Sequence, residues 1–205
     1  STSSSTDIVS CDSYQWNGFN LTQSGSYSYD GSGEVNDFSI DFDGNDYVEL
    51  NSLSNTINSA DGFTFGAWFK TDYSVNNSEN RFFSVDALDN STLFAIGVSY
   101  LGALHVQTQD NFVSMNNGYN DDEWHYVVVT TGTSSSLNQM LIYVDGVQLY
   151  SGNFSVDWDD AYFFTLGAEL SGFAYNNFFD GKVDNVNFWK NINAYQAIRS
   201  QHCPP

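Results

Sequence analysis

An oxygen-rich segment near residue 40 is the first part of the chain whose side chains point to specific chemistry. Asp41, Asp43, Asn45 and Asp46 lie close together around Gly44. Calcium takes about six to eight oxygen ligands from carboxylates, amides and carbonyls, and a tight turn can direct several of them to one point. The same residue types also form ordinary turns by hydrogen bonding to their own backbone. The segment therefore predicts a calcium site or a simple turn, and the residue types leave both open.

A second group of residues places aromatic rings among polar side chains, which is the pattern of a sugar site. Sugar rings stack on tryptophan or tyrosine, while carboxylates and amides bind the hydroxyl groups. Residues 157–160 and the loop 169–177 fit this pattern, and 109–120 is a third candidate loop. The predicted ligand-binding residues are Asp157, Trp158, Asp159, Asp160, Phe173, Tyr175 and Asn176. Loops of this composition also form protein-binding surfaces, so a protein partner is an alternative.

The overall composition is strongly acidic, with 5 basic and 25 acidic side chains among 205 residues and a formal charge of −20. Nucleic acids and anionic membranes are excluded as partners, because binding to both depends on Lys and Arg. A content of 41% hydrophobic and 17% aromatic residues is enough to bury a core. The aspartates lie among Asn, Ser and Gly, a loop composition that excludes a mostly helical fold. No apolar run approaches the roughly 18 residues of a membrane span, and any secretion signal is expected to lie outside this sequence.

Residue patterns typical of catalysis are missing. The histidines are His105, His125 and His202, and neither a Gly-x-Ser-x-Gly motif nor zinc-ligand spacing accompanies them. Cys11 and Cys203 lack the Cys-x-x-Cys spacing of a redox pair. An acidic chain rich in Asn, Ser and Thr looks extracellular, where disulfides persist, so we expect these cysteines to pair. Two reduced, unrelated cysteines are the alternative.

Short β-rich runs alternate with turn residues from about residue 37 onward, which is the pattern of a β-sandwich. The ten predicted strands are residues 38–42, 47–50, 63–70, 81–85, 92–98, 103–108, 124–131, 140–144, 162–166 and 181–188. One short helix is expected at residues 192–201. Ten strands without a long helix favour an all-β fold of two antiparallel sheets packed face to face.

Three local patterns predict finer features of these strands. Residues 124–130 carry apolar side chains on both faces, which indicates a central strand covered on both sides. The Asp-Gly pair at 145–146 separates two apolar runs and predicts a hairpin with a type I′ turn. Aromatic residues flank the Asn-Gly pair at 17–18, which predicts a small N-terminal hairpin.

Five of these runs resemble, in chain order, the strand motifs of laminin-G-like, concanavalin A-type jelly-roll domains, which include the pentraxins. The runs are residues 40–48 (IDFDGNDYV), 63–70 (FTFGAWFK), 123–127 (EWHYV), 142–146 (IYVDG) and 179–189 (FDGKVDNVNFW). The segment around residues 11–27 resembles short segments of marine microbial surface proteins. The resemblance implies a jelly roll over residues 37–205, preceded by a hairpin segment at 11–36 and a linker at 1–10.

The resemblance also bears on metal binding and catalysis. In the resembled fold the first and last core strands run side by side, and many members bind a structural calcium ion there. This implies that Asp184 joins the oxygen-rich segment. The predicted Ca²⁺ ligands are Asp41, Asp43, Asn45, Asp46 and Asp184. Members that cleave β-glucans carry a Glu-x-Asp-x-x-Glu strand, which this sequence lacks, so we expect no enzymatic activity.

Together these observations predict an extracellular carbohydrate-binding or adhesion module of a larger secreted or surface protein, monomeric as an isolated module. The expected partner is a neutral or calcium-bridged glycan, or a cell-surface protein, because the few basic residues lie mainly in strands rather than in the candidate loops. A structural or protein-binding spacer is the first alternative. A polysaccharide-active enzyme is the second.

Overall fold

The computed structural model divides the chain into two units, one formed by Ser39–Pro204 and the other by Ser1–Phe38 with Pro205. The described residues are 14–16, 19–21, 39–50, 53, 63–75, 79–109, 111–115, 118–133, 136–153, 160–171 and 174–190. Within this part of the chain no helix is long and apolar enough to cross a membrane.

The smaller unit contains one short hairpin. Strand β1 (Tyr14–Trp16) pairs antiparallel with β2 (Phe19–Leu21) across two intervening residues. This pairing confirms the predicted N-terminal hairpin. Cys11, Cys203 and the predicted helix at 192–201 lie outside the described residues, so the disulfide stays a prediction.

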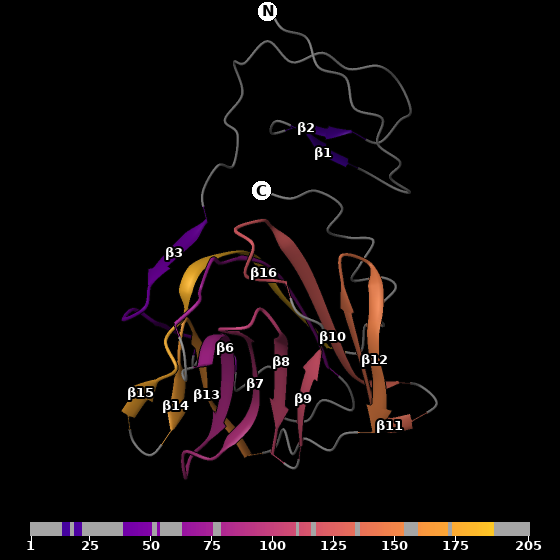
Figure 1. Cartoon of the computed structure of the whole chain (residues 1–205). Helices are drawn as coiled ribbons and strands as arrows, with labels where there is room; N and C mark the ends of the chain where they lie inside the picture. The colour runs from indigo at the N-terminus through magenta and orange to yellow at the C-terminus, as the bar shows by residue number, and fades with distance from the viewer. Residues whose placement is uncertain are drawn as a thin grey trace, which may run out of the picture. The chain divides into compact units, whose positions relative to one another are not determined.

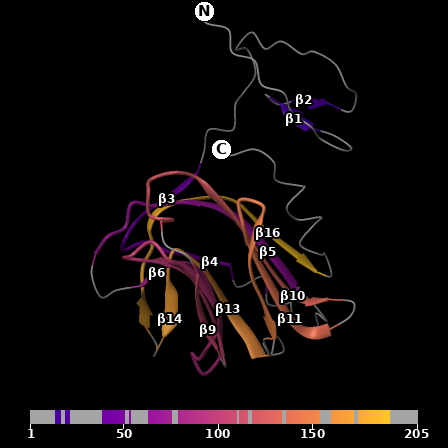
Figure 2. The same cartoon turned by 45° about the vertical axis from the view of Figure 1, so that its right-hand side comes forward.

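The larger unit is a sandwich of two antiparallel six-stranded sheets, shown in Figure 1 and from a second direction in Figure 2. Sheet I has the order β12 (Val147–Asn153), β11 (Ser136–Val144), β10 (His125–Thr133), β5 (Phe63–Lys70), β16 (Asp180–Lys190) and β3 (Ile40–Asp43). Sheet II has the order β4 (Val48–Glu49), β13 (Ala161–Leu166), β6 (Glu79–Ala87), β7 (Thr92–Ser99), β8 (Leu104–Thr108) and β9 (Phe112–Met115). Each of the ten predicted runs forms a strand, which confirms the predicted fold class.

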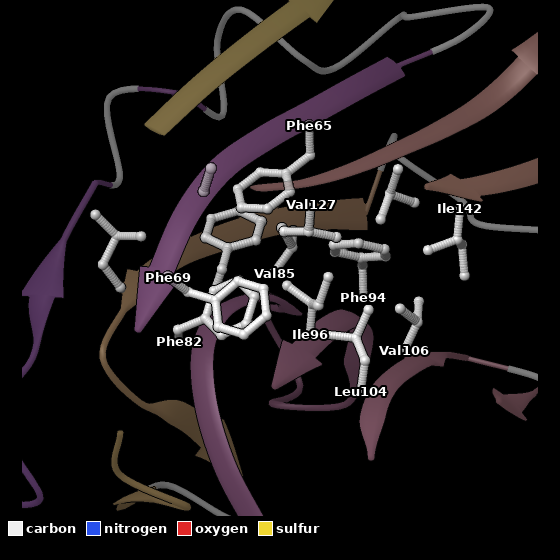
Figure 3. Packing of buried hydrophobic residues seen from close by; sticks show 14 of the residues in the cluster. Phe65, Phe69, Phe82, Val85, Phe94, Ile96, Leu104, Val106, Val127 and Ile142 are labelled. Atoms are coloured by element: carbon white, nitrogen blue, oxygen red, sulfur yellow. The ribbon is translucent and has the colours of Figure 1, made fainter. Parts of the chain in front are cut away.

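The core lies between the sheets and is built on phenylalanines from β5 and β6 (Figure 3). The ring of Phe65 stacks on that of Phe83 with a centroid distance of 4.8 Å, and Phe69 stacks on Phe82 at 5.0 Å. Consecutive strand residues normally face opposite sides of a sheet. The register with β7 shifts between Arg81 and Phe83, and this bulge lets two consecutive phenylalanines face the core.

Two finer predictions about strands are confirmed. Strand β10 lies between β11 and β5, and its residues 126–131 are all buried, as expected for a central strand. The turn between β11 and β12 has positive φ angles at both Asp145 (50°) and Gly146 (78°), which defines a type I′ turn.

Two segments that we expected to be loops contain strands. Within residues 109–120, β9 pairs with β8 and forms an edge of sheet II. Within residues 169–177, β14 (Glu169–Ser171) and β15 (Ala174–Asn176) form a hairpin, and β14 packs against β6. In both segments the short strands are surrounded by Asn and Gly residues, which are typical of turns. Pairing with neighbouring strands therefore contributes to their strand structure along with the local sequence.

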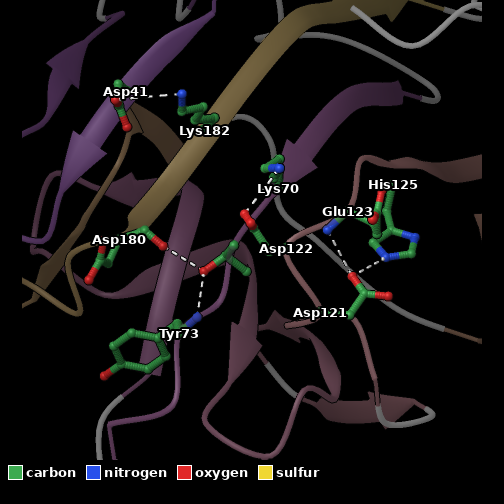
Figure 4. Close-up of polar contacts among 10 residues, drawn as sticks. Asp41, Lys70, Tyr73, Asp121, Asp122, Glu123, His125, Asp180 and Lys182 are labelled. Atoms are coloured by element: carbon green, nitrogen blue, oxygen red, sulfur yellow. Dashed lines mark hydrogen bonds and ion pairs between the residues drawn. The ribbon is translucent and has the colours of Figure 1, made fainter.

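The start of β10 is held to the β11–β12 turn by a histidine between two aspartates. The Nδ1 atom of His125 lies 2.7 Å from Oδ2 of Asp145. Its Nε2 atom lies 3.1 Å from Oδ1 of Asp121, a contact drawn in Figure 4. The other oxygen of Asp145 accepts a hydrogen bond from the backbone N–H of Tyr126. The hydrogen bond to Asp145 is the largest cause that raises the pKa of His125 above its usual 6.5; burial opposes the rise and Asp121 supports it.

We expect this histidine to make the stability of the protein pH-dependent. Because its pKa is raised on folding, the stabilisation is complete below pH 6.5 and is lost as the pH rises through the raised pKa. His125→Gln should lower the free energy of unfolding at pH 6.5 by about 1 kcal/mol. It should also flatten the fall of the melting temperature between pH 7 and 9.

His105→Gln is the matched control. Burial, with a smaller effect of Arg81, lowers the pKa of His105 to about 4, so this side chain does not titrate between pH 7 and 9. Between pH 7 and 9 the melting temperature of the His105→Gln variant should fall as much as that of the unmodified protein. If the melting temperature of the His125→Gln variant falls by the same amount, His125 is not the source of the pH dependence.

Candidate functional site

The oxygen-rich segment forms an acidic end where β3 meets β16 (Figure 4). Asp43 lies opposite Asp180, and Asp41 lies opposite Lys182, whose Nζ atom is 3.9 Å from Oδ2 of Asp41. Burial is the main cause that raises the pKa of Asp180, followed by the negative charges of Asp72, Asp43 and Asp41. This end of the sheet therefore carries more negative charge than its lysine neutralises.

The structure separates Asp184 from Asp43, which is also one of the predicted calcium ligands. Asp184 is four residues beyond Asp180 on β16, about 13 Å along the strand, and its cross-strand partner is Trp68. The neighbour of Asp43 is Asp180, which the sequence motifs did not single out. Among the described residues, no three His, Cys, Asp or Glu side chains converge enough to hold a metal ion. Asp184 therefore does not share a site with Asp43, and calcium binding near Asp43 stays a prediction.

The predicted sugar-binding residues are only partly described. Asp157, Trp158, Asp159 and Phe173 lie outside the described residues. Asp160 is exposed just before β13, whereas Tyr175 and Asn176 are on β15. Tyr175 is hydrogen-bonded to Glu49, whose cross-strand partner is Thr165. Thr165 is five residues beyond Asp160 in the chain, about 17 Å along the strand. The described geometry therefore does not bring Asp160 to the tyrosine.

Tyr175 instead meets a second tyrosine, and the two form what we call the tyrosine platform, Tyr47 and Tyr175. Their rings stack with a centroid distance of 3.8 Å and an interplanar angle of 26°. The hydroxyl of Tyr175 donates a 2.6 Å hydrogen bond to Oε1 of Glu49, although these residues are 126 positions apart. Tyr47 is 41% exposed, so one ring of the platform faces solvent. The local sequence pattern predicts only a strand at Tyr47, because the tyrosine that stacks on it is 128 positions away in the chain.

A buried ion pair between Arg81 of β6 and Glu169 of β14 anchors the hairpin that carries Tyr175 to sheet II. Arg81 is 1% exposed, and its Nε atom lies 3.6 Å from Oε2 of Glu169, which is itself buried. Arg81 also forms an ion pair with Glu79 and donates a 2.8 Å hydrogen bond to Gln107. Thr92 donates a 2.6 Å hydrogen bond to the other oxygen of Glu169. These contacts connect β14 to β6, β7 and β8.

Removing the arginine should destabilise the protein strongly. Arg81→Met leaves the buried Glu169 carboxylate without its cation, and breaking a buried ion pair costs about 3 to 5 kcal/mol. The expected loss is measured by urea unfolding. The double variant with Glu169→Gln should recover part of the stability, because a neutral amide then replaces the buried carboxylate that lacks a cation.

Lys182→Met provides the control for this experiment. The Lys182 side chain is 45% exposed and its pair with Asp41 is on the surface, so its loss should cost about 1 kcal/mol or less. Equal effects of Arg81→Met and Lys182→Met would show that the buried pair is not an anchor.

The comparisons with known proteins agree with this architecture. A family profile of laminin-G type, described as the concanavalin A-like lectin/glucanases superfamily, matches residues 42–195. No curated protein sequence matches the chain. Among solved structures, the CBM40 module of the Ruminococcus gnavus IT-sialidase superposes with a TM-score of 0.65 at 12% identity, covering 79% of this chain and 95% of that one.

Two further structures place the chain in the same fold. The NanB sialidase from Streptococcus pneumoniae gives a TM-score of 0.63 at 16% identity, covering 81% of this chain but 27% of the sialidase. The heptameric SAP-like pentraxin from Limulus polyphemus gives 0.54 at 14% identity, covering 70% of each chain. At these identities the likeness concerns the fold. With the profile match over residues 42–195 and the two packed antiparallel sheets, it shows that the chain belongs to the concanavalin A-like lectin/glucanases superfamily.

Proposed function

We propose that this chain is an extracellular carbohydrate-binding module of a larger secreted or surface protein, and that the tyrosine platform binds the sugar. The observation that carries the proposal is a half-exposed tyrosine stacked on a second one whose hydroxyl is held by Glu49. Similar solved structures support it. They include a CBM40 module bound to α2,3 sialyllactose and a putative carbohydrate-binding protein from Bacteroides ovatus.

The geometry of the platform suits a sugar ring. The exposed face of Tyr47 offers an apolar surface for the C–H groups of the sugar. Because Tyr175 packs behind it and is tied to Glu49, the Tyr47 ring is held in place before the sugar arrives. The carboxylates of Glu49 and Asp46 lie nearby in the chain and accept hydrogen bonds from sugar hydroxyls. Their charge favours neutral or calcium-bridged sugars over polyanionic ones.

We propose binding without catalysis. Glycoside hydrolysis generally needs two carboxyl groups on either side of the bond, about 5 to 5.5 Å apart for retention and farther apart for inversion. The Glu-x-Asp-x-x-Glu strand of β-glucan-cleaving members is not part of this sequence. The superfamily also contains glucanases, so polysaccharide cleavage is measured alongside binding.

The test is a glycan array, with and without calcium, followed by titration of the best ligand. Tyr47→Ala should weaken binding about tenfold, which corresponds to about 1.4 kcal/mol for one stacking ring. Tyr162→Ala is the matched control, because Tyr162 is another exposed tyrosine (50%) but lies three residues before Thr165, the cross-strand partner of Glu49, about 10 Å along β13. The control should bind like the unmodified protein.

Three outcomes would contradict the proposal. Equal losses in both variants would place the sugar elsewhere. Silence across neutral, sulfated and sialylated glycans would favour a structural or protein-binding spacer. New reducing ends or unsaturated products after incubation with polysaccharides would show an enzyme.

Calcium binding is tested separately by calorimetric titration of chelator-treated protein. We expect calcium uptake with a dissociation constant of about 10⁻⁴ to 10⁻³ M, as in extracellular modules, and a higher melting temperature. Asp43→Asn should weaken it, because Asp43 lies in the acidic end beside Asp180. Asp184→Asn should have no effect, because Asp184 is distant along the strand. The absence of heat and of any change in melting temperature would remove calcium from the proposal.

A further inference from the structure

Among the described residues, two carboxyl groups are buried where β14 packs on β6, and only one of them is paired with a cation. Glu169 is 4% exposed and pairs with Arg81. Asp86 is fully buried, and its Oδ2 atom accepts hydrogen bonds from Ser84 Oγ at 2.8 Å and from the backbone N–H of Leu170 at 3.4 Å. Its Oδ1 atom is buried without a hydrogen-bond partner. The site therefore holds one more carboxyl group than it can neutralise.

A proton resolves this imbalance. An ionised carboxylate in an apolar site is costly unless a cation or several hydrogen bonds compensate it. Burial is the largest influence on Asp86, the hydrogen bond from Ser84 opposes it, and the charge of Glu169 adds to it, so that the pKa of Asp86 rises from 3.8 to about 7. The described groups acting on Asp86 from packed elements are Glu169 of β14 and the neutral Thr92 of β7. Arg81, on the same strand as Asp86, is paired with Glu79 and Glu169.

The position of Asp86 connects this proton to the tyrosine platform. The backbone N–H of Leu170 donates a hydrogen bond to Asp86, and Leu170 is the cross-strand partner of Tyr175 in the β14–β15 hairpin. Tyr175 in turn stacks on Tyr47, and its hydroxyl donates a hydrogen bond to Glu49. Movement of a neighbouring element that lets water reach Asp86 stabilises its ionised form. Such an element is β14, which packs on β6 and donates the Leu170 hydrogen bond to Asp86. Such a movement displaces the backbone that sets the Tyr175 ring.

We propose that Asp86 is a positioning residue for the tyrosine platform and that it acts in its protonated form, so that sugar affinity falls when the pH rises and Asp86 ionises. The inference rests on the proposed function of the platform. The direction of the pH effect on sugar affinity follows from linkage between protonation and conformation. Asp86 binds its proton more tightly when the hairpin is closed than when it is open, so protonation favours the closed hairpin. The closed hairpin is the state in which the two tyrosines stack.

The first experiment needs no sugar. In ¹⁵N-labelled protein the Leu170 amide should titrate between pH 5 and 8.5 with a midpoint of about 7. Asp86→Asn should abolish this titration. Asp89→Asn is the control, because Asp89 is an exposed aspartate three residues away whose side chain accepts hydrogen bonds from Ser91 of its own turn. It should leave the titration unchanged. A Leu170 amide that does not respond to pH would overturn the inference.

Ser84→Ala keeps the inference testable even if Asp86→Asn does not fold. The Ser84 hydrogen bond lowers the pKa of Asp86, so its removal should move the Leu170 midpoint to higher pH. A midpoint that stays in place or moves to lower pH would show that the titrating group is not Asp86.

The second experiment measures affinity for the best array glycan at pH 5.5 and 8.5. The unmodified protein and Asp89→Asn should bind roughly threefold or more weakly at pH 8.5, while Asp86→Asn keeps its affinity at both. A titrating Leu170 amide with pH-independent affinity would overturn the positioning role and leave the proposed function standing. Failure to bind any glycan would contradict the proposed function, and the sugar-free titration would still show whether the proton site exists.

Discussion

The stacking of phenylalanines from β5 and β6 is the contact on which the rest of this structure depends. Phe65 on Phe83 and Phe69 on Phe82 join the two sheets at their centre. The bulge next to Arg81 allows two consecutive phenylalanines of β6 to enter the core. The bulge also determines which side of the sheet the residues before and after Phe82 and Phe83 face. The same feature that closes the sandwich therefore determines which polar residues are available to the β14–β15 hairpin.

The buried charge of Arg81 on β6 connects strands of sheet II to the β14–β15 hairpin, whereas the surface ion pairs do not. Arg81 is buried and reaches strand β8 through Gln107 and the β14–β15 hairpin through Glu169. Gly97 makes this possible on the neighbouring strand, because a Cβ atom there would lie 2.9 Å from the Arg81 Cα atom and 2.1 Å from a backbone oxygen. The close approach of β6 and β7 thus needs a residue without a side chain. The hairpin then holds Tyr175 against Tyr47, which links the interior of sheet II to the exposed platform.

Membership of the concanavalin A-like superfamily explains the scaffold but not the site. The similar solved structures share 12 to 16% of their residues with this chain, so they have the sandwich in common rather than its loops. Recognition in such a fold depends on the segments attached to the sheets. In this chain the segments that we propose for recognition are the turn before β4 and the β14–β15 hairpin.

The sequence by itself determined the strands that have a strong local pattern. The run that forms β5 was predicted with the bounds it has, and the type I′ turn at Asp145 followed from one dipeptide. Alternation and turn residues act over a few positions, so they can be read without the fold. The β14–β15 hairpin and β9 were missed because each strand is short and is flanked by Asn, Asp or Gly residues that are typical of turns.

Only the tertiary structure decided which side chains meet. Strand register placed Asp180 rather than Asp184 beside Asp43. Long-range packing brought Tyr47 to Tyr175 and left Asp86 buried without a cation. Such contacts depend on how distant strands align and on where a bulge falls, because a shift of one residue turns every side chain of a strand to the other face. The chain's acidity was evident from its composition, but the burial that raises the pKa of Asp86 comes from the fold.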